Sequence, residues 1–208
     1  MLPHGVYAIV DGSAGKPPLE LVGAFVRGGA AVVQLRLKDI GAGEFLRVAR
    51  EARKLTAGKA LLLINDRPDV AKLAEADGVH LGQDDLPVEA ARAILGPKAL
   101  IGLSTHSDAE IDGALAAGVD YIGFGPVFAT RSKGDAPLPP PHGIRGLYAA
   151  VKRAGKTPVV AIGGITAASS QHLAWWGVRG VAAIAELCNA PSPEQRTREM
   201  VEAFGYPQ

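Results

Sequence analysis

Short, continuous apolar runs alternate with longer amphipathic runs along the whole chain. The short runs are bounded by Gly, Pro, Asp or Asn, which is typical of strands that are buried on both faces of a parallel sheet. We expect strands at 6–10, 31–37, 61–64, 78–81, 100–103, 121–124, 158–162 and 180–183.

Each predicted strand is followed by a segment with apolar residues at helical spacing. We expect helices at 19–27, 43–55, 69–76, 88–95, 108–117, 144–154, 167–176 and 194–204. Eight such units in 208 residues give about 26 residues per unit (208 divided by 8). The alternation predicts an α/β fold, a single-domain (β/α)8 TIM barrel over residues 1–208. The alternative is an open, doubly wound sheet with fewer strands.

The composition narrows the range of partners. Lys plus Arg number 22 and Asp plus Glu 21, so the net charge is +1. Because nucleic-acid-binding proteins usually carry a basic excess, we expect a small anionic ligand and no nucleic acid. The single cysteine, Cys188, cannot form an internal disulfide, and residues 1–16 lack the pattern of a signal peptide. With no uncharged apolar run of about 18 residues, we expect a cytoplasmic protein with no membrane partner, and homo-oligomerisation is left open.

Polar residues gather where the predicted strands end. The active site of a TIM barrel lies at the carboxyl ends of its strands. The side chains at these ends include Asp11, Gln34, Arg36, Lys38, Asn65, Asp66, Gln83, Asp84, Asp85, Ser104, Thr130, Ser132 and Lys133. This convergence favours an enzyme.

The second strand alternates polar and apolar residues. Gln34, Arg36 and Lys38 share one face, and period 2 places that face inside the barrel because the outer face packs on helices. Two cations on an inner face require an anion, and a phosphate or diphosphate would satisfy them. The alternative is internal pairing with Asp66 or Asp85.

Asp66 and Asp85 follow neighbouring strands, and two carboxylates beside a phosphate site suit Mg²⁺. The alternative for Asp66 is capping of the helix that follows, and the pattern does not decide between Asp84 and Asp85. The five histidines lack the spacing of zinc ligands, and we expect His80, which lies in mid-strand, to be packed rather than catalytic.

Two loops have the composition of a phosphate site. The long 125–143 connection carries Thr130, Ser132 and Lys133, although a surface loop with an incidental lysine is the alternative. Gly163-Gly164 precedes a predicted helix, where backbone N–H groups favour an anion. A tight turn with Thr166 as the helix N-cap is the alternative there.

The blocks QLRLKD, INDRPDVA, GVHLGQDDL, IGLSTHS, DYIGFGPVFATRSK and VVAIGGI, in this order, resemble the thiamine phosphate synthase family. The resemblance runs over residues 6–203. It implies a Mg²⁺-dependent barrel enzyme that joins 4-amino-5-hydroxymethyl-2-methylpyrimidine diphosphate to 4-methyl-5-(2-hydroxyethyl)thiazole phosphate. The products would be thiamine phosphate and diphosphate.

The resemblance also implies roles for individual residues. Gln34 would contact the pyrimidine, and Asp66 and Asp85 would hold Mg²⁺. Arg36, Lys38, Asn65, Ser104 and Lys133 would hold the diphosphate, and Thr130, Ser132, Gly164, Ile184 and Ala185 would bind the thiazole phosphate. The implied mechanism is dissociative: diphosphate leaves, and the thiazole nitrogen captures a pyrimidine-methyl cation. Arg36, Lys38, Ser104 and Lys133 would act on that leaving group, and no paired nucleophile and base is expected.

One departure and two rivals accompany this resemblance. Ala185 stands where the family usually has a serine, which removes a hydroxyl from the thiazole phosphate site. A thiazole tautomerase of the same superfamily would have a histidine after the sixth strand, where this chain has Gly125, Pro126 and Val127. A non-catalytic barrel that binds a phosphate of the thiamine pathway is the second rival.

Overall fold

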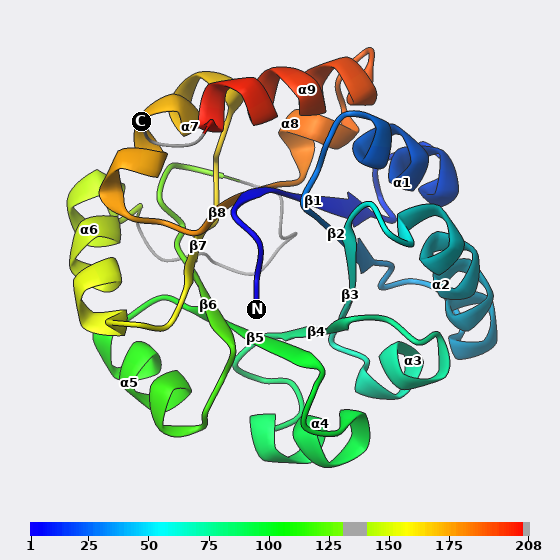
Figure 1. The fold of residues 1–208 in the computed structure, drawn as a ribbon, viewed down its shortest axis with the longest axis horizontal. Helices are drawn as coiled ribbons and strands as arrows, with labels where there is room; N and C mark the ends of the chain where they lie inside the picture. Colours follow the sequence, from blue (N-terminus) through cyan, green and yellow to red (C-terminus); the bar gives the residue numbers. More distant parts are fainter. Residues whose placement is uncertain (131–140, 206–208) are drawn as a thin grey trace.

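The structure, a computed structural model, describes residues 1–130 and 141–205. Within these residues the strands form one closed parallel barrel in which each strand pairs with its neighbours in chain order, and β8 pairs with β1. The helices form a ring around the barrel (Figure 1). The predicted (β/α)8 architecture is confirmed, and an open sheet is ruled out.

The strands lie close to their predicted positions. They are β1 Gly5–Asp11, β2 Val32–Arg36, β3 Leu61–Asn65, β4 Gly78–Leu81, β5 Leu100–Thr105, β6 Tyr121–Phe124, β7 Val159–Ala161 and β8 Gly180–Ala183. The β1–β2 register places Asp11 opposite Arg36, and the β3–β4 register places Asn65 opposite His80. Polar residues from adjacent strands therefore reach the same end of the barrel.

The long helices of the structure correspond to the helices predicted from the hydrophobic pattern, but some of them end at different residues. They are α1 Pro18–Arg27, α2 Ala42–Thr56, α3 Pro68–Leu73, α4 Val88–Leu95, α5 Asp108–Ala116, α6 Gly143–Ala154, α7 Ala167–Leu173, η1 Ala174–Trp176, α8 Ala185–Cys188 and α9 Pro193–Phe204. The helix expected to run to residue 76 ends at Leu73, and Glu75 has a left-handed backbone with φ 53°. The four-residue α8 was not expected from the sequence.

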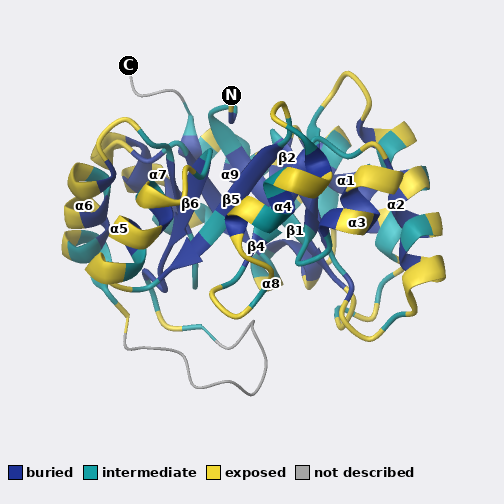
Figure 2. Ribbon diagram, turned by 90° about the horizontal axis from the view of Figure 1, so that it is seen from below, coloured by how far each residue is buried: buried dark blue, intermediate teal, exposed yellow. Residues whose placement is uncertain are grey.

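Two apolar layers hold the barrel together. The larger lies between strands and helices and includes Val33, Leu35 and Leu37, the apolar face of β2 that the alternation predicts to point outward. A smaller cluster fills the barrel itself, namely Leu2, Tyr7, Val32, Leu63, Leu100, Tyr121, Val160 and Ala182. Figure 2 shows the buried strands in the middle and the exposed residues on the outer faces of the helices and in loops. The interior is therefore a packed core and not a pore.

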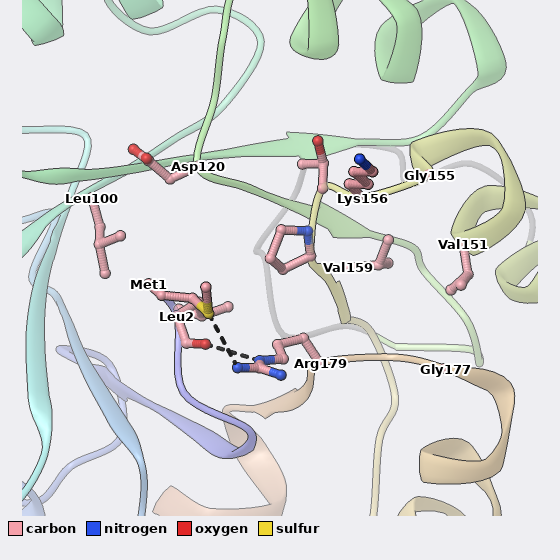
Figure 3. A pocket seen from close by; sticks show the side chains of 12 residues that line it. Met1, Leu2, Leu100, Asp120, Val151, Gly155, Lys156, Val159, Gly177 and Arg179 are labelled. Atoms are coloured by element: carbon pink, nitrogen blue, oxygen red, sulfur yellow. Dashed lines mark hydrogen bonds between the residues drawn. The ribbon is translucent and has the colours of Figure 1, made fainter.

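The amino-terminal end of the barrel is closed by the chain's own first residues. Leu2 is 2% exposed, its carbonyl accepts a hydrogen bond from Arg179 Nε at 2.9 Å, and the N-terminus lies at the centre of the ring in Figure 1. A pocket of about 480 Å³ lies here, between Leu2, Leu100, Val159 and Arg179 (Figure 3). It is at the opposite end from the polar strand ends, where a barrel's residues serve stability rather than chemistry.

In the described ranges, no helix has the combination of length and apolarity needed to cross a membrane.

Gly78 lies where β4 passes close to β5. A Cβ atom at this position would lie 1.9 Å from the carbonyl oxygen of Leu100. Because only a shift of backbone could relieve that contact, we expect Gly78→Ala to lower the free energy of unfolding by about 3 kcal/mol.

Urea unfolding would measure this loss, with Gly113→Ala as the matched control. Gly113 is exposed in α5, and its added Cβ would meet nothing within 4 Å. Alanine in a helix is favoured over glycine by about 0.5–1 kcal/mol, so the control should be slightly stabilised. Equal effects of the two substitutions would contradict a tight β4–β5 approach.

Candidate active site

The carboxyl ends of the first five strands bring polar side chains to one mouth of the barrel. Asp11 ends β1, Arg36 ends β2, Asn65 ends β3, and Ser104 lies near the end of β5, while Asp66 and Asp85 follow β3 and β4. This is the end where α/β barrels carry their chemistry.

Arg36 is fixed by an ion pair with Asp11. The Arg36 side chain is 13% exposed and its guanidinium contacts Asp11 Oδ2, whose side chain is 6% exposed. Asp11 also accepts hydrogen bonds from the backbone N–H of Ser13 at 2.9 Å and from the Ser13 hydroxyl at 2.5 Å. Burial opposes the charged form of Asp11, but these bonds and the charge of Arg36 outweigh it and hold the pKa of Asp11 below its ordinary value.

Of the two cations, Arg36 has a partner that the sequence did not predict, whereas Lys38 has a predicted one. Internal pairing with Asp66 or Asp85 was the alternative to an anionic ligand, and for Arg36 this is wrong because its partner is Asp11. Lys38 does approach Asp66, at 3.6 Å, but its side chain is 55% exposed. Arg36 is therefore held rigidly at the mouth, whereas Lys38 is held loosely.

Asp85, and not Asp84, faces the site. Asp85 Oδ2 accepts a hydrogen bond from the backbone N–H of Gly82 at 2.6 Å, and its carboxyl group contacts that of Asp66, while Asp84 is exposed. Helix capping by Asp66 is not observed either. The N-cap of α3 is Arg67, without a side-chain cap hydrogen bond, and Asp66 itself has a left-handed backbone with φ 61°.

Asp66 and Asp85 form a pair of like charges. Burial first, and then the hydrogen bond and charge of Asp85, raise the pKa of Asp66 to about 6 from 3.8, although Lys38 and Arg36 oppose this rise. Two neighbouring carboxylates repel each other when both are ionised, and a bound cation offsets part of this repulsion. Their arrangement therefore fits a divalent metal ion.

The donor set suits Mg²⁺ better than a metal that needs a complete protein cage. Across residues 1–130 and 141–205, no group of three or more His, Cys, Asp or Glu side chains could hold a metal ion. Mg²⁺ commonly takes one or two carboxylates and completes its shell with water and substrate phosphate.

The raised pKa of Asp66 predicts a pH-dependent stability of the metal-free protein. Between about pH 4 and pH 6 the folded chain binds more protons than the unfolded chain, so stability falls as the pH rises through this window. Asp66→Asn removes the penalty, and asparagine tolerates the left-handed backbone. We expect the variant to be more stable than the parent by about 1–2 kcal/mol at pH 7.5 in EDTA and equal to it below about pH 4. Denaturant unfolding across this range would measure it, and a difference independent of pH would contradict it.

Gln34 and Ser104, 2% and 3% exposed, lie deeper, at opposite ends of a chain of buried hydrogen bonds. Gln34 Nε2 donates to Tyr7 OH at 2.6 Å, and the hydroxyls of Tyr7 and Tyr121 are 2.9 Å apart. His80 Nδ1 lies 2.8 Å from Tyr121 OH, and His80 Nε2 lies 2.9 Å from Ser104 Oγ. His80 is packed inside the barrel, as expected, but its pairing with Ser104 was not expected.

The loops after β6 and β7 lie against each other. Gly164 has φ 66°, and a Cβ there would lie 2.6 Å from the carbonyl oxygen of Ala129, so only glycine fits. This contact brings Gly164 next to the segment that ends in Thr130. Ser132 and Lys133 lie outside the described residues.

The helix after Gly164 is capped by the chain itself. Thr166 is the N-cap of α7 and forms a capping box with Ser169, as the tight-turn alternative predicts. Glu186 Oε1 accepts a hydrogen bond from the backbone N–H of Ala167 at 3.2 Å. Ile184 and Ala185 follow β8, and Ala185 is exposed at the start of α8.

The sequence analysis did not identify three residues as part of this region: Asp11 at the mouth, and Tyr7 and Tyr121 in the barrel interior beneath it. Asp11 was noted only as a strand end, and Tyr7 and Tyr121 only as parts of strands. Parallel pairing of β1 with β2 is the signal that could have matched Asp11 to Arg36. Nothing local marks the two tyrosines as partners, because 114 residues separate them.

A closed barrel of eight parallel strands, with polar side chains gathered at one mouth, defines an α/β-barrel enzyme. Residues 6–187 match the model of the family described as thiamine monophosphate synthase. The chain therefore belongs to the thiamine monophosphate synthase family, a family of enzymes of thiamine biosynthesis.

Individual relatives agree with this assignment. The chain is 46% identical over 201 residues to the thiamine-phosphate synthase of Anaeromyxobacter dehalogenans, covering 96% of this chain and 87% of the relative. It is 42% identical over 192 residues to that of Moorella thermoacetica, covering 90% of each. The solved structure of thiamine phosphate pyrophosphorylase from Pyrococcus furiosus superposes with a TM-score of 0.87 at 35% identity, covering 96% of this chain and 95% of that one.

Proposed function

We propose that this barrel transfers the pyrimidinylmethyl group of 4-amino-5-hydroxymethyl-2-methylpyrimidine diphosphate to the nitrogen of 4-methyl-5-(2-hydroxyethyl)thiazole phosphate. The products are thiamine phosphate and diphosphate. One observation carries the proposal: two cations, Arg36 and Lys38, lie at the same mouth as the carboxylate pair Asp66 and Asp85. A leaving diphosphate needs both features.

The diphosphate end of the substrate is assigned to the cations. Arg36 is already oriented by Asp11, so it loses little side-chain freedom when it binds phosphate oxygens. Lys38, Asn65, Ser104 and Lys133 complete this end. Because the charge on the diphosphate grows as its bond to carbon breaks, fixed cations stabilise the transition state more than the bound substrate.

Asp66 and Asp85 are the residues that would hold Mg²⁺. When bound, this ion supplies positive charge that neutralises the departing diphosphate. The pair would supply carboxylate oxygens to the ion, and water and substrate phosphate would complete its shell.

The two rings are assigned to separate parts of the mouth. Gln34, which is buried inside the barrel, would contact the pyrimidine. Thr130, Ser132, Gly164, Ile184 and Ala185 would bind the thiazole phosphate. Ala185 offers no hydroxyl there, so backbone N–H groups and the hydroxyls of the loop after β6 take a larger share.

The proposed chemistry needs positioning and charge, and no covalent intermediate with the protein. The carbon–oxygen bond breaks with its electron pair on diphosphate, and the thiazole nitrogen then donates its own pair to the methylene carbon. The side chains hold the two rings in line while the cations retain the leaving group.

An end-point assay tests this function. The protein is incubated with both substrates and Mg²⁺, and thiamine phosphate is oxidised to its fluorescent thiochrome derivative. We expect product that requires both substrates and disappears with EDTA. Folded protein that yields no product would overturn the proposal. The two rivals, a thiazole tautomerase and a non-catalytic binder, would then be distinguished by an assay with a thiazole carboxylate phosphate, which only the tautomerase would convert.

A further inference from the structure

The short helix α8 follows the strand whose end was assigned to the thiazole phosphate. It begins at Ala185, directly after Ile184, and ends at Cys188. It contacts α9 and β1, and Figure 1 shows it inside the ring of longer helices. Because a helix of four residues forms little more than one turn and is unstable by itself, neighbouring elements have to hold it in place.

Lys16 holds the carboxyl end of α8. It lies in the loop after β1, is partly buried, and donates hydrogen bonds from Nζ to the carbonyl oxygens of Cys188 at 3.0 Å and Ala190 at 2.5 Å. The last carbonyls of a helix have no partner within the helix, and a cation stabilises them. The Cys188 thiol also donates to the carbonyl oxygen of Ile9 at 3.2 Å. This end of α8 is therefore fixed to β1 and to the loop that follows it.

Glu186 joins α8 to the two helices beside it. Its Oε1 accepts hydrogen bonds from the backbone N–H of Ala167 at 3.2 Å and from Arg196 Nη1 at 3.3 Å. Ala167 is the first residue of α7, and Arg196 belongs to α9. The Glu186 side chain is 22% exposed, so these bonds are less screened by solvent than bonds at an open surface. One carboxylate thus connects α7, α8 and α9.

The loop before α7 is held on its other side by the segment after β6. A Cβ at Gly164 would lie 2.6 Å from the carbonyl oxygen of Ala129 and 2.8 Å from Cβ of Phe128, so the two backbones touch. Thr130 is the next residue along that segment. With Glu186 on one side and Gly164 on the other, the segments after β6, β7 and β8 form one connected unit.

The first turn of α7 offers few groups to a phosphate. The N–H of Thr166 donates to Ser169 Oγ at 2.9 Å, and the N–H of Ser169 donates to Thr166 Oγ1 at 3.1 Å. The N–H of Ala167 is taken by Glu186, whose negative charge also repels an anion. A phosphate in this part of the mouth is therefore directed to the loop before α7 and to the start of α8.

We propose that Glu186 and Lys16 are positioning residues that hold the start of α8 at a fixed distance from the loop of Gly164, and that this distance sets the affinity for the thiazole phosphate. They act through the backbone and contact no reacting atom. Their role is large in this chain because Ala185 has no hydroxyl, so the placement of backbone groups carries more of the binding. This inference rests on the proposed function and on its assignment of these two segments to the thiazole phosphate.

The kinetic test at Glu186 compares two substitutions. Glu186→Ala removes both hydrogen bonds, and we expect it to raise KM for the thiazole phosphate about tenfold and to leave KM for the pyrimidine diphosphate unchanged. Glu186→Gln keeps an oxygen that accepts from the Ala167 N–H, so its KM should stay within about threefold of the parent value. Glu199→Gln is the matched control, because Glu199 is the other carboxylate beside Arg196, at 3.4 Å, and it should leave both KM values unchanged.

Lys16→Met tests the other end of α8. Methionine keeps much of the length of the side chain but donates no hydrogen bond to the carbonyls of Cys188 and Ala190. We expect the same selective rise in KM for the thiazole phosphate. Lys98→Met, at an exposed position before β5, is the control and should have no effect. Thermal unfolding of each variant would establish that it is folded at the assay temperature.

A second readout needs neither substrate nor turnover. Amide hydrogen exchange, followed by NMR, should be faster at Ala167 in Glu186→Ala than in the parent and in Glu186→Gln. Exchange that is unchanged in Glu186→Ala would contradict the connection between α8 and α7.

The outcomes separate this inference from the proposed function. A folded parent that forms no product and shows no binding of the thiazole phosphate by calorimetry would reject the proposed function. An active parent would reject the positioning role alone in either of two cases. In the first, Glu186→Ala and Lys16→Met leave KM for the thiazole phosphate unchanged. In the second, they raise KM equally for both substrates, as a general loss of structure would.

Discussion

Asp85→Asn is expected to lower kcat/KM for the pyrimidine diphosphate by about a thousandfold at a Mg²⁺ concentration that saturates the parent. Asparagine keeps the oxygen that accepts from the Gly82 N–H but lacks the negative charge. The paired carboxylates of Asp66 and Asp85 would then become a single charge, and the metal ion would bind more weakly. Steady-state rates measured over a range of Mg²⁺ concentrations would show the midpoint displaced to higher concentration.

Asp84→Asn is the matched control for this substitution, because Asp84 is the exposed neighbour with the same chemistry. It should leave both the rate and the Mg²⁺ midpoint unchanged. An unaltered Mg²⁺ titration in Asp85→Asn, or equal effects of the two substitutions, would remove Asp85 from the metal site.

Arg36→Lys is expected to reduce kcat by about a hundred- to a thousandfold. Lysine keeps the charge, but it cannot hold Asp11 and present a second planar edge to phosphate oxygens at the same time. The loss should be in kcat more than in KM, because the interaction strengthens as the diphosphate departs. Quenched single-turnover measurement of thiamine phosphate formed on the enzyme would separate a slower chemical step from slow product release.

Loss of stability has to be separated from loss of chemistry at Arg36. Removing its charge altogether would leave the buried carboxylate of Asp11 without its cationic partner, which destabilises the fold. Arg36→Lys is therefore preferred to an alanine variant, with unfolding followed in parallel. Arg47→Lys, on the exposed face of α2, is the control. A lysine at position 36 that supports the full kcat would contradict the role assigned to Arg36.

Most of the fold could be predicted because the same two local patterns alternate along the chain. Buried strands appear as short continuous apolar runs, and each helix appears as a segment with apolar residues at helical spacing. The four-residue α8 is shorter than the window in which helical period can be recognised. The early end of α3 depends on the left-handed backbone of Glu75, a residue type that gives no warning of it.

The sequence could predict which residues of the candidate site lie at strand ends, but not which side chains they contact. The alternation in β2 placed Gln34 and Arg36 on the inner face, and the structure has them there. It could not supply partners that depend on register across the barrel. Whether Arg36 meets Asp11 or Asp66 depends on the register between β1 and β2, which places Asp11 opposite Arg36. The chain from Gln34 to Ser104 depends on side chains that reach across a closed interior.

The closing pair of strands has a consequence for how the protein folds. Every other strand pair joins neighbours in the sequence, whereas β8 pairs with β1, with Gly180 opposite Gly5. During synthesis, the first seven strands can pair as they emerge, but β1 waits for the last one. Until then β1 and β7 are open edges that can pair with other chains. The high contact order of this one seam makes it the expected slow step, so Ile184 and Ala185, which follow β8, reach their final positions last.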